Sequence, residues 1–234
     1  MNPIIEANNL SYSYPDGTKA IKGVSFKVYR DKCIAIIGSN GAGKSTLLLN
    51  LSGILLPSGE LTLFGVKLER GTAKELRRKI AVVFQNPDDQ LFCNTVYEDI
   101  AFGPVNYGLD NEEVEIRVGR ALKKLKLEGY ENRNPYHLSY GEKKRASIAT
   151  VYSMDPEIYL FDEPTANLDP RGGREIAGLI SEINKTRIVV THDLDFVKST
   201  CSYTIVLNRG VKEAEGKTEE ILSNKELLYR CRLL

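Results

Sequence analysis

The sequence predicts an α/β fold built around a mainly parallel β-sheet. Three observations support this: short apolar runs recur along the chain, candidate helices separate them, and a glycine-rich segment joins the first such run to a helix. The 234 residues, 42% of them hydrophobic and 27% charged, suffice for one or two globular domains with a sizeable core.

The balance of charge limits the classes of partner. Lys and Arg number 32 and Asp and Glu number 31, so the net charge of +1 supplies no bulk field for nucleic acid or anionic lipid. No apolar run approaches the roughly 20 residues that a bilayer-spanning helix needs. The first residues show no secretory signal, and the four cysteines form no C-x-x-C pair. We therefore expect a cytoplasmic protein with reduced cysteines that mostly pack in the core, without a disulfide framework or zinc site.

The strands can be assigned in order along the chain. Apolar and polar residues alternate at 10–14 and 24–28 around a turn at 15–17, which predicts an antiparallel ribbon. Residues 33–37 form an uninterrupted apolar run, which is typical of a buried parallel strand, and similar short runs occupy residues 80–84, 158–161, 188–190 and 204–207. A ligand crevice is expected at the carboxyl ends of these strands.

The middle of the chain has a different pattern. Between residues 96 and 153 no strand-like run occurs, while Val114, Val118, Ala121, Leu122 and Leu125 share one helix face. We interpret this part as an inserted helical subdomain; the alternative is that these helices merely cover the sheet. A hairpin turn at 208–210 and mixed helix at 218–228 close the chain.

These observations divide one domain, residues 1–234, into segments. Residues 1–32 form an antiparallel β-subdomain, 33–90 and 154–210 the ligand-binding core, 91–153 the helical subdomain, and 211–234 a closing segment.

Residues 38–45 match the phosphate-loop pattern G-x-x-x-x-G-K-[ST] between a predicted strand and a predicted helix. Glycines let backbone N–H groups turn toward phosphate oxygens, and the helix N-terminus adds partial positive charge. Lys44 can neutralise the β- and γ-phosphates of a nucleotide, and Ser45 can bind Mg²⁺. The alternative is a flexible glycine turn. The predicted nucleotide contacts are Gly38, Ser39, Asn40, Gly41, Ala42, Gly43, Lys44, Ser45 and Thr46.

Two carboxylates end the apolar run at 158–161. Asp162 is placed to hold Mg²⁺, and Glu163 to polarise a water for in-line attack on the γ-phosphate. A solvated loop end is the alternative for this Asp-Glu pair. Its position after a buried run, in a chain with a complete phosphate loop, favours the catalytic interpretation.

The segment L-S-Y-G-E at 138–142 resembles the signature L-S-G-G-Q of ATP-binding-cassette (ABC) ATPases, and the resemblance covers nearly the whole chain. It implies a P-loop NTPase with a RecA-like core, which binds ATP and Mg²⁺ and dimerises head to tail. Ser139 and Gly141 would then reach the γ-phosphate held by the opposite subunit. Tyr140 departs from the glycine of the pattern. The alternative for Ser139 is a simple helix N-cap.

The same resemblance assigns further roles. Gln85 is similar to the glutamine that reaches Mg²⁺, which implies Ser45, Gln85 and Asp162 as metal ligands. Asp169, in the segment 166–169, is similar to a residue that crosses the dimer interface, and His192 to the histidine that senses the γ-phosphate. Tyr14 resembles the aromatic residue that stacks on adenine, with Tyr12 as a competitor. The implied catalytic set is Lys44, Glu163 and His192.

The stretch Q-N-P-D-D-Q-L-F at 85–92, continued by T-V-Y-E-D-I-A-F-G-P at 95–104, resembles the ATPases of energy-coupling factor importers, including cobalt and nickel importers. It implies a surface that grasps helices of a transmembrane coupling subunit. We expect apolar anchors at Phe92, Val96, Ile100 and Phe102, and acidic contacts at Asp88, Asp89, Glu98 and Asp99. The alternative is that these acids are a solvated helix start.

Together the residues and the resemblance imply an ATP-hydrolysing importer subunit, peripheral at the cytoplasmic face of the cell membrane, that drives uptake of a transition-metal ion (cobalt or nickel) or a vitamin. Its expected partners are a second ABC ATPase subunit, identical or related, a transmembrane coupling subunit and a substrate-binding membrane subunit, without nucleic acid. The alternative is an ABC-type ATPase that acts on nucleic acid or the ribosome. That class joins two ATPase units or carries a long coiled coil between the phosphate loop and the signature, and this chain has neither.

Overall fold

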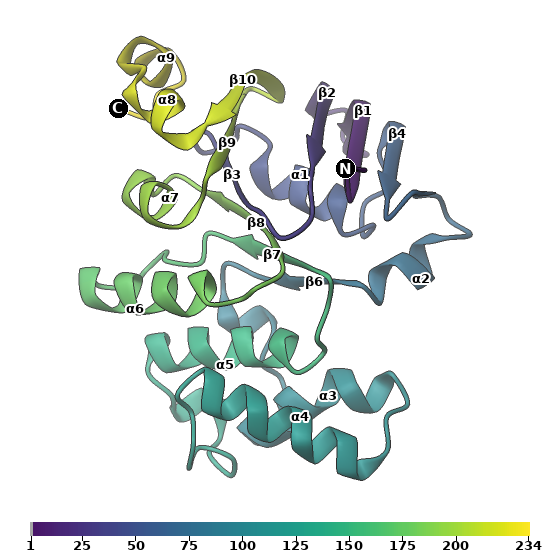
Figure 1. Cartoon of the computed structure of the whole chain (residues 1–234), viewed down its shortest axis with the longest axis vertical. Coiled ribbons are helices and arrows are strands. Elements are labelled where there is room, and N and C mark those ends of the chain that lie inside the picture. The colour runs from purple at the N-terminus through teal and green to yellow at the C-terminus, as the bar shows by residue number, and fades with distance from the viewer. Residues whose placement is uncertain (1) are drawn as a thin grey trace.

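A computed structural model describes residues 2–234 of the chain. The central sheet consists of β3 (Cys33–Ile37), β6 (Ile80–Val83), β7 (Ile158–Asp162), β8 (Thr186–Thr191), β9 (Tyr203–Asn208) and β10 (Val211–Lys217). Across the sheet the order is β10-β9-β3-β8-β7-β6, and only β10 runs antiparallel to its neighbour (Figure 1). The predicted α/β fold class is confirmed.

The parallel strands all end at one edge of this sheet. The register pairs Ile37 of β3 with Thr191 of β8, and Asp162 of β7 with Val190 of β8. Both faces of β3 are buried, which explains why its sequence is uninterruptedly apolar rather than alternating. The segments that follow β3, β7 and β8 therefore emerge side by side, and they carry most of the predicted site residues.

A second sheet is antiparallel and consists of β1 (Ile5–Ser13), β2 (Lys19–Val28), β4 (Ser58–Leu63) and β5 (Val66–Lys67), in the order β2-β1-β4-β5. The first two strands are the expected ribbon. The placement of all residues 33–90 in the core differs from the structure, because β4 pairs with β1 and aligns Leu61 with Ala7 and Leu63 with Ile5. Those two leucines bury their side chains in the antiparallel sheet's core.

Helices cover both faces of the central sheet. The antiparallel sheet and α1 (Lys44–Leu51) share an apolar cluster with one face, to which α2 (Ala73–Arg77) also contributes. The other face packs against α6 (Pro170–Ser181) and α7 (Leu194–Thr200), and this cluster continues into α8 (Thr218–Ser223) and α9 (Lys225–Arg230). Within residues 2–234, no helix combines the length and apolar character that crossing a bilayer requires.

The segment between β6 and β7 is helical. It contains the short 3-10 turns η1 (Pro87–Asp89) and η2 (Pro135–His137) and the helices α3 (Val96–Asn106), α4 (Asn111–Lys124) and α5 (Tyr140–Tyr152), which lie together at the lower end of the molecule in Figure 1. The apolar face expected on α4 is buried. These helices pack on one another, as expected of an inserted subdomain, and they also extend the apolar cluster of the central sheet, as expected of helices that cover it.

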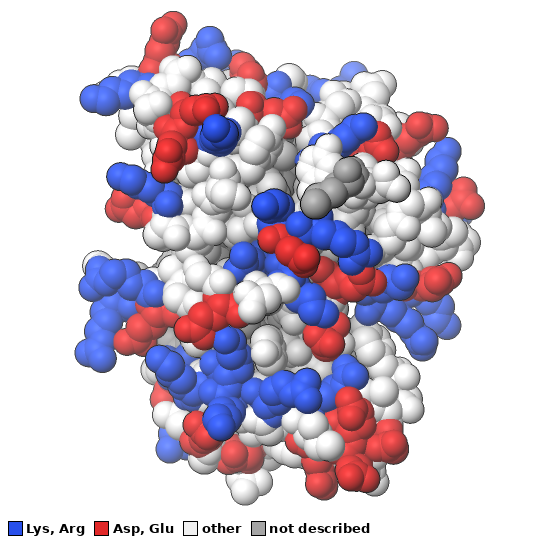
Figure 2. All heavy atoms as spheres, viewed as in Figure 1, with Lys and Arg blue, Asp and Glu red and all other residues white. Residues whose placement is uncertain are grey.

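Charge is distributed without a single dominant sign. Figure 2 shows basic and acidic side chains interspersed over one face, with a band of basic residues across the lower part and acidic residues gathered at the lower right. This mixture agrees with the formal net charge of +1.

The turn between β9 and β10 ties the two sheets to the loop that follows β3. Gly210 N donates to Ala42 O at 3.0 Å, and Lys22 N donates to Gly210 O at 2.8 Å. Gly210 has a φ of +84°, and a Cβ there would lie 2.5 Å from Ala20 O. Only glycine fits this contact without strain.

Gly210→Ala should lower the free energy of unfolding by about 2–4 kcal/mol, because it adds both left-handed backbone strain and a backbone clash. Urea denaturation of the purified protein measures this. The matched control is Gly119→Ala in α4, where a Cβ meets nothing within 4 Å and should stabilise the helix by about 0.5–1 kcal/mol. Equal stability of the two variants would contradict the packing of the turn.

Candidate functional site

The glycine-rich loop after β3 forms a tight turn at the start of α1. Gly43, the residue that precedes this helix, has a φ of 99°. A Cβ at this position would lie 2.5 Å from Ala20 O, so the loop closes against β2 only with glycine here. The turn leaves the first N–H groups of α1 facing the adjacent cavity, where they can bind phosphate oxygens.

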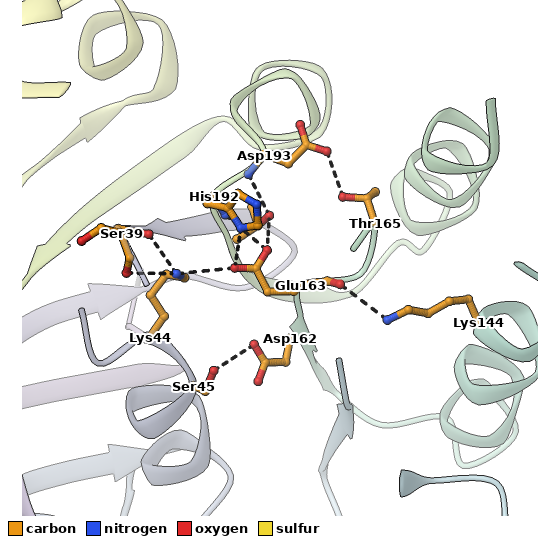
Figure 3. Close-up of polar contacts among 11 residues, drawn as sticks. Ser39, Lys44, Ser45, Lys144, Asp162, Glu163, Thr165, His192 and Asp193 are labelled. Atoms are coloured by element: carbon orange, nitrogen blue, oxygen red, sulfur yellow. Dashed lines mark hydrogen bonds and ion pairs between the residues drawn. The ribbon is translucent and has the colours of Figure 1, made fainter. Parts of the chain in front are cut away.

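Lys44 lies folded back under this loop. Its Nζ donates to Gly38 O at 2.8 Å and to Ser39 O at 3.4 Å, and lies 3.5 Å from Glu163 Oε1 (Figure 3). The two side chains are only 7% and 8% exposed. The ammonium group is thus held at the junction between the phosphate loop and the end of β7.

The oxygens suited to Mg²⁺ lie beside this lysine. Ser45 Oγ donates to Asp162 Oδ1 at 3.1 Å, as Figure 3 shows, and Gln85 lines the same cavity as Ser45. Burial raises the pKa of Asp162, and the hydrogen bond from Ser45 opposes that rise. A hydroxyl, a carboxylate and an amide oxygen are hard ligands of the kind Mg²⁺ prefers, so these residues fit the ion.

Glu163 is fixed by contacts from three directions. Its Oε2 accepts from Thr191 Oγ1 at 2.9 Å and from His192 N at 3.3 Å, and its Oε1 lies 3.0 Å from His192 Nδ1. Its backbone has a left-handed φ of 43°, and its N donates to Val190 O at 2.9 Å. A residue with a strained backbone and a fully hydrogen-bonded carboxylate is typical of functional positions.

His192 and its neighbours form the far wall of the cavity. The His192 side chain is 60% exposed, whereas Thr191 is buried at the end of β8. Asp193 caps α7 by accepting from Phe196 N and also accepts from Thr165 Oγ1 at 2.9 Å. This capping bond fixes the backbone that presents the imidazole to the cavity.

The cavity has a volume of about 800 Å³, enough for a nucleoside triphosphate. Its lining includes Tyr14, the residues from Gly43 to Thr46, Gln85, Glu163 and His192. Of the two competing tyrosines, Tyr14 faces this cavity, and its hydroxyl lies 2.9 Å from Thr46 Oγ1. Tyr12 packs edge-on against Tyr14 with ring centroids 5.1 Å apart and contributes to the core beneath it.

Three further cations line the cavity: Lys19, Lys22 and Arg209. None of them forms an ion pair with an acidic residue among residues 2–234. Sequence reasoning missed them because no local motif marks them. Arg209 reaches the cavity only because the β9–β10 turn packs on the phosphate loop.

Ser139, Gly141 and Asp169 lie elsewhere. Among the residues described, none of the three lines the cavity of its own chain. Ser139 begins α5 and forms a capping box with Glu142, whose pKa is lowered to about 2 mainly by the hydrogen bond from the Ser139 hydroxyl. Asp169 caps α6 by accepting from Gly172 N at 2.6 Å. The N-cap interpretation of Ser139 is thus satisfied, and a role at the γ-phosphate requires a second chain.

Lys144 has an unexpected position. Although lysine is among the most exposed residue types, this side chain is 0% exposed. Its Nζ donates to Gln85 O and lies 3.5 Å from Glu163 O. Burial lowers the pKa of Lys144 to about 8, and the charges of Asp162 and Glu163 oppose that shift. The lysine therefore joins α5 to the segments after β6 and β7.

A second, apolar groove of about 470 Å³ lies between the residues after β6 and the helices α3 and α5. Phe92 and Phe102 line it with 60% and 49% of their surface exposed and rings 4.9 Å apart. Val96 and Ile100 are fully buried in the core, so their prediction as surface anchors is wrong. They lie on the inner side of the amphipathic helix α3.

The predicted acidic contacts are mostly engaged within the chain. Asp99 is buried and accepts from Phe92 N and Cys93 N at 3.0 Å each, and Glu98 closes the capping box of α3. Asp88 pairs with Lys143 at 2.7 Å. The Asp89 carboxylate accepts from the neighbouring Asn86 amide at 3.2 Å and is exposed. For Glu98, which is exposed in the first turn of α3, the alternative of a solvated helix start describes the structure. Asp99 fits neither interpretation, because its carboxylate is buried against the backbone of residues 92 and 93.

Known proteins share both sequence and fold with this chain. The family model described as "ABC transporter" matches residues 21–166. A putative ABC transporter ATP-binding protein of Geobacter sulfurreducens is 48% identical over 98% of this chain and 93% of its own length. The energy-coupling factor transporter ATP-binding protein EcfA of Methanothermobacter thermautotrophicus is also 48% identical, over 98% of this chain and 76% of its own length.

Solved structures agree. The cbiO1 protein of Clostridium perfringens, described as part of the ABC transporter complex cbiONQ, is 39% identical and superposes with a TM-score of 0.88 over 100% of this chain and 96% of that one. The cassette MJ0796, a dimer in a post-hydrolysis state bound to ADP and phosphate, is 29% identical with a TM-score of 0.82 over 92% and 98% of the two chains. The family match, the relatives and the solved structures, together with the phosphate loop and the buried Glu163, show that this chain belongs to the ABC transporter family. It is an ATP-hydrolysing subunit of the type found in energy-coupling factor transporters.

Proposed function

We propose that this chain powers an energy-coupling factor importer for a transition-metal ion (cobalt or nickel) or a vitamin, from the cytoplasmic face of the membrane. The observation that carries the hydrolytic part is the placement of Glu163, buried and held by three hydrogen-bonding groups, beside Lys44 at the cavity. The exposed groove at Phe92 and Phe102 is the observation that supports docking to a membrane subunit.

ATP enters with its base against Tyr14 and its phosphates on the loop after β3. Backbone N–H groups at the start of α1 bind the β-phosphate, and Lys44 turns from Glu163 to the β- and γ-phosphates. Ser45, Asp162 and Gln85 would hold Mg²⁺, which supplies positive charge to the same oxygens. Lys19, Lys22 and Arg209 add to the positive potential of the cavity.

Glu163 acts on the attacking water. Its carboxylate is oriented by the Thr191 hydroxyl and the backbone N–H of His192, so that an oxygen released from Lys44 accepts a hydrogen bond from a water in line with the γ-phosphate. The His192 imidazole is exposed to the cavity and carries a single N–H when neutral. It turns this N–H from Glu163 to the γ-phosphate when ATP is bound, and so senses the phosphate. Positioning and electrostatics supply the catalysis, as in other phosphoryl transfers.

A second ATPase subunit completes each site. Ser139 and Gly141, at the N-terminus of the 13-residue helix α5, are placed away from their own cavity, and we assign them to the γ-phosphate held by the facing subunit. Asp169, at the start of α6, belongs to the same interface. ATP favours the closed dimer because only that form makes these contacts, and hydrolysis removes the difference.

The groove lined by Phe92 and Phe102 accepts a helix of the transmembrane coupling subunit. Two exposed phenylalanines in edge-to-face contact offer an apolar anchor site. Asp89, which precedes the groove-lining Gln90 in sequence, offers an exposed carboxylate to a basic residue. The backbone at Gln85 joins this region to α5 through Lys144, so that movement at the groove reaches the signature helix.

Glu163→Gln should reduce ATP turnover by at least about 100-fold while ATP affinity changes by no more than a few-fold, because the amide keeps the shape but loses the base. Phosphate release measures turnover, and light scattering should detect an ATP-dependent dimer that persists. Glu157→Gln, at a surface ion pair with Arg30, is the control. Undiminished turnover in Glu163→Gln would refute the assignment.

Phe92→Asp should abolish recovery of membrane proteins with the tagged, detergent-extracted subunit, because burying a charge in the groove is costly. ATP binding by the isolated variant should remain unchanged. The control Tyr229→Asp alters a side chain that is 65% exposed on α9 and should retain the partners. Full recovery of partners with Phe92→Asp would exclude the groove as the docking site.

The transport function itself is tested with the complex purified from its own membranes and reconstituted in vesicles. We expect ATP-dependent accumulation of radiolabelled cobalt, nickel or a vitamin, abolished by Glu163→Gln. ATP turnover that DNA, RNA or ribosomes stimulate, without uptake of any of these solutes, would contradict the proposed function.

A further inference from the structure

Two of the four cysteines touch each other in the core. Cys33 Sγ and Cys201 Sγ lie 2.9 Å apart, although the residues are 168 positions apart in sequence. The residues are 4% and 6% exposed. A covalent S–S bond is about 2.05 Å long, so the sulfurs are less than about 1 Å from bonding distance.

The backbones around this pair are held by the central sheet. Cys33 opens β3, and Cys201 ends α7 just before β9. Ser202 N donates to Cys33 O at 3.3 Å, and the next residues, Ile34 and Tyr203, pair in the parallel register. The register that pairs Ile34 with Tyr203 places Cys33 beside Ser202, the neighbour of Cys201 in sequence. Because the sulfurs are already 2.9 Å apart, a bond requires them to approach by less than about 1 Å.

The surroundings make the two sulfurs unequal. Arg187 of β8 stands opposite Cys33 in the register, and its Nε is buried without a hydrogen-bond partner in the part of the chain that is described. The hydrogen bond from Cys33 lowers the pKa of Cys201, with Thr200 and Arg187 acting in the same direction against burial. The same sulfur contact, followed by burial, raises the pKa of Cys33. The geometry favours the same sulfur: Cys201 Sγ has the Thr200 hydroxyl 3.4 Å away and the Cys33 thiol 2.9 Å away, and both can donate to it. Negative charge is therefore better satisfied on Cys201 than on Cys33.

We propose that Cys33 and Cys201 form an oxidation site, at which hydrogen peroxide or a similar two-electron oxidant closes a reversible intrachain disulfide. The Cys201 thiolate attacks a peroxide oxygen, the O–O bond breaks, and hydroxide leaves and takes up the proton that Cys201 had released. The Cys33 sulfur then attacks the sulfenic sulfur of Cys201. The thiol proton and the sulfenic hydroxyl leave as water, so that two thiols give two electrons and the peroxide becomes two waters.

The bond would link segments that lead to the nucleotide cavity. The far end of β3 carries the phosphate loop, and α7 begins just after His192. Because the disulfide closes a loop of 168 positions, it restricts the unfolded chain strongly. The oxidised protein should therefore melt at least about 5 °C above the reduced one.

The first test uses the folded, fully reduced wild-type protein. After exposure to hydrogen peroxide, the chain is unfolded and its remaining thiols are blocked with N-ethylmaleimide. Mass spectrometry then measures the intact chain and its proteolytic peptides. We expect two fewer alkylated thiols, a peptide pair that joins Cys33 to Cys201, a higher melting temperature, and reversal of all three by dithiothreitol. The proposal would be overturned if Cys33 and Cys201 were both still alkylated under conditions that oxidise Cys93. A disulfide between other cysteines would overturn it as well.

The second test examines the order of attack. Cys33→Ser should leave a sulfenic acid on Cys201 that dimedone traps, whereas Cys201→Ser should leave Cys33 unlabelled. Cys93→Ser, which changes a thiol outside the pair, should form the Cys33–Cys201 bond as the wild type does. Labelling of Cys33 alone would contradict the assignment of Cys201 as the attacking sulfur. Since the wild-type measurement needs no variant, the bond itself is tested even if one variant does not fold.

Discussion

The contact between Lys44 and Glu163 is the interaction on which the rest of the site depends. Two opposite charges, each more than nine-tenths buried, are costly to remove from water unless further bonds satisfy them. The Lys44 ammonium donates hydrogen bonds to the carbonyls of Gly38 and Ser39. The Glu163 carboxylate accepts hydrogen bonds from the Thr191 hydroxyl and the His192 backbone N–H. The pair therefore requires the ends of β3, β7 and β8 to meet, which is what the parallel register of the central sheet provides.

The signature helix is connected to this pair from the other side. The fully buried Lys144 of α5 donates to the Gln85 carbonyl and lies near the Glu163 carbonyl. The Tyr140 hydroxyl also lies 3.4 Å from Gln85 O and 3.3 Å from the Asn167 amide. The residue that departs from the family pattern thus joins the signature to two neighbouring segments. Displacement of α5 relative to the sheet must disturb the backbone of both Gln85 and Glu163.

Features set by local sequence were predictable, and features set by distant packing were not. The phosphate loop, the strand before it and the acidic end of β7 depend on neighbouring residues, and the fold class inferred from them is confirmed. Residues 58–63 fall inside the predicted core segment 33–90, and only their pairing with β1 assigns strand β4 to the antiparallel sheet. Val96 and Ile100 are predicted as surface anchors, but both are buried. Local sequence does not decide which face of this short apolar helix is exposed, because that depends on what packs against it. Contact between Cys33 and Cys201 likewise follows from topology, not spacing.

The most direct measurement of the central claim is an experimental structure of Glu163→Gln, alongside the wild type with a nonhydrolysable ATP analogue, each with Mg²⁺. We expect that Lys44 Nζ leaves residue 163 for the β- and γ-phosphates, that the freed side chain faces a water in line with the γ-phosphate, and that Ser139 of a second subunit contacts that phosphate. A bound triphosphate with Lys44 still against Glu163 in the wild type, and no facing subunit, would contradict the central claim.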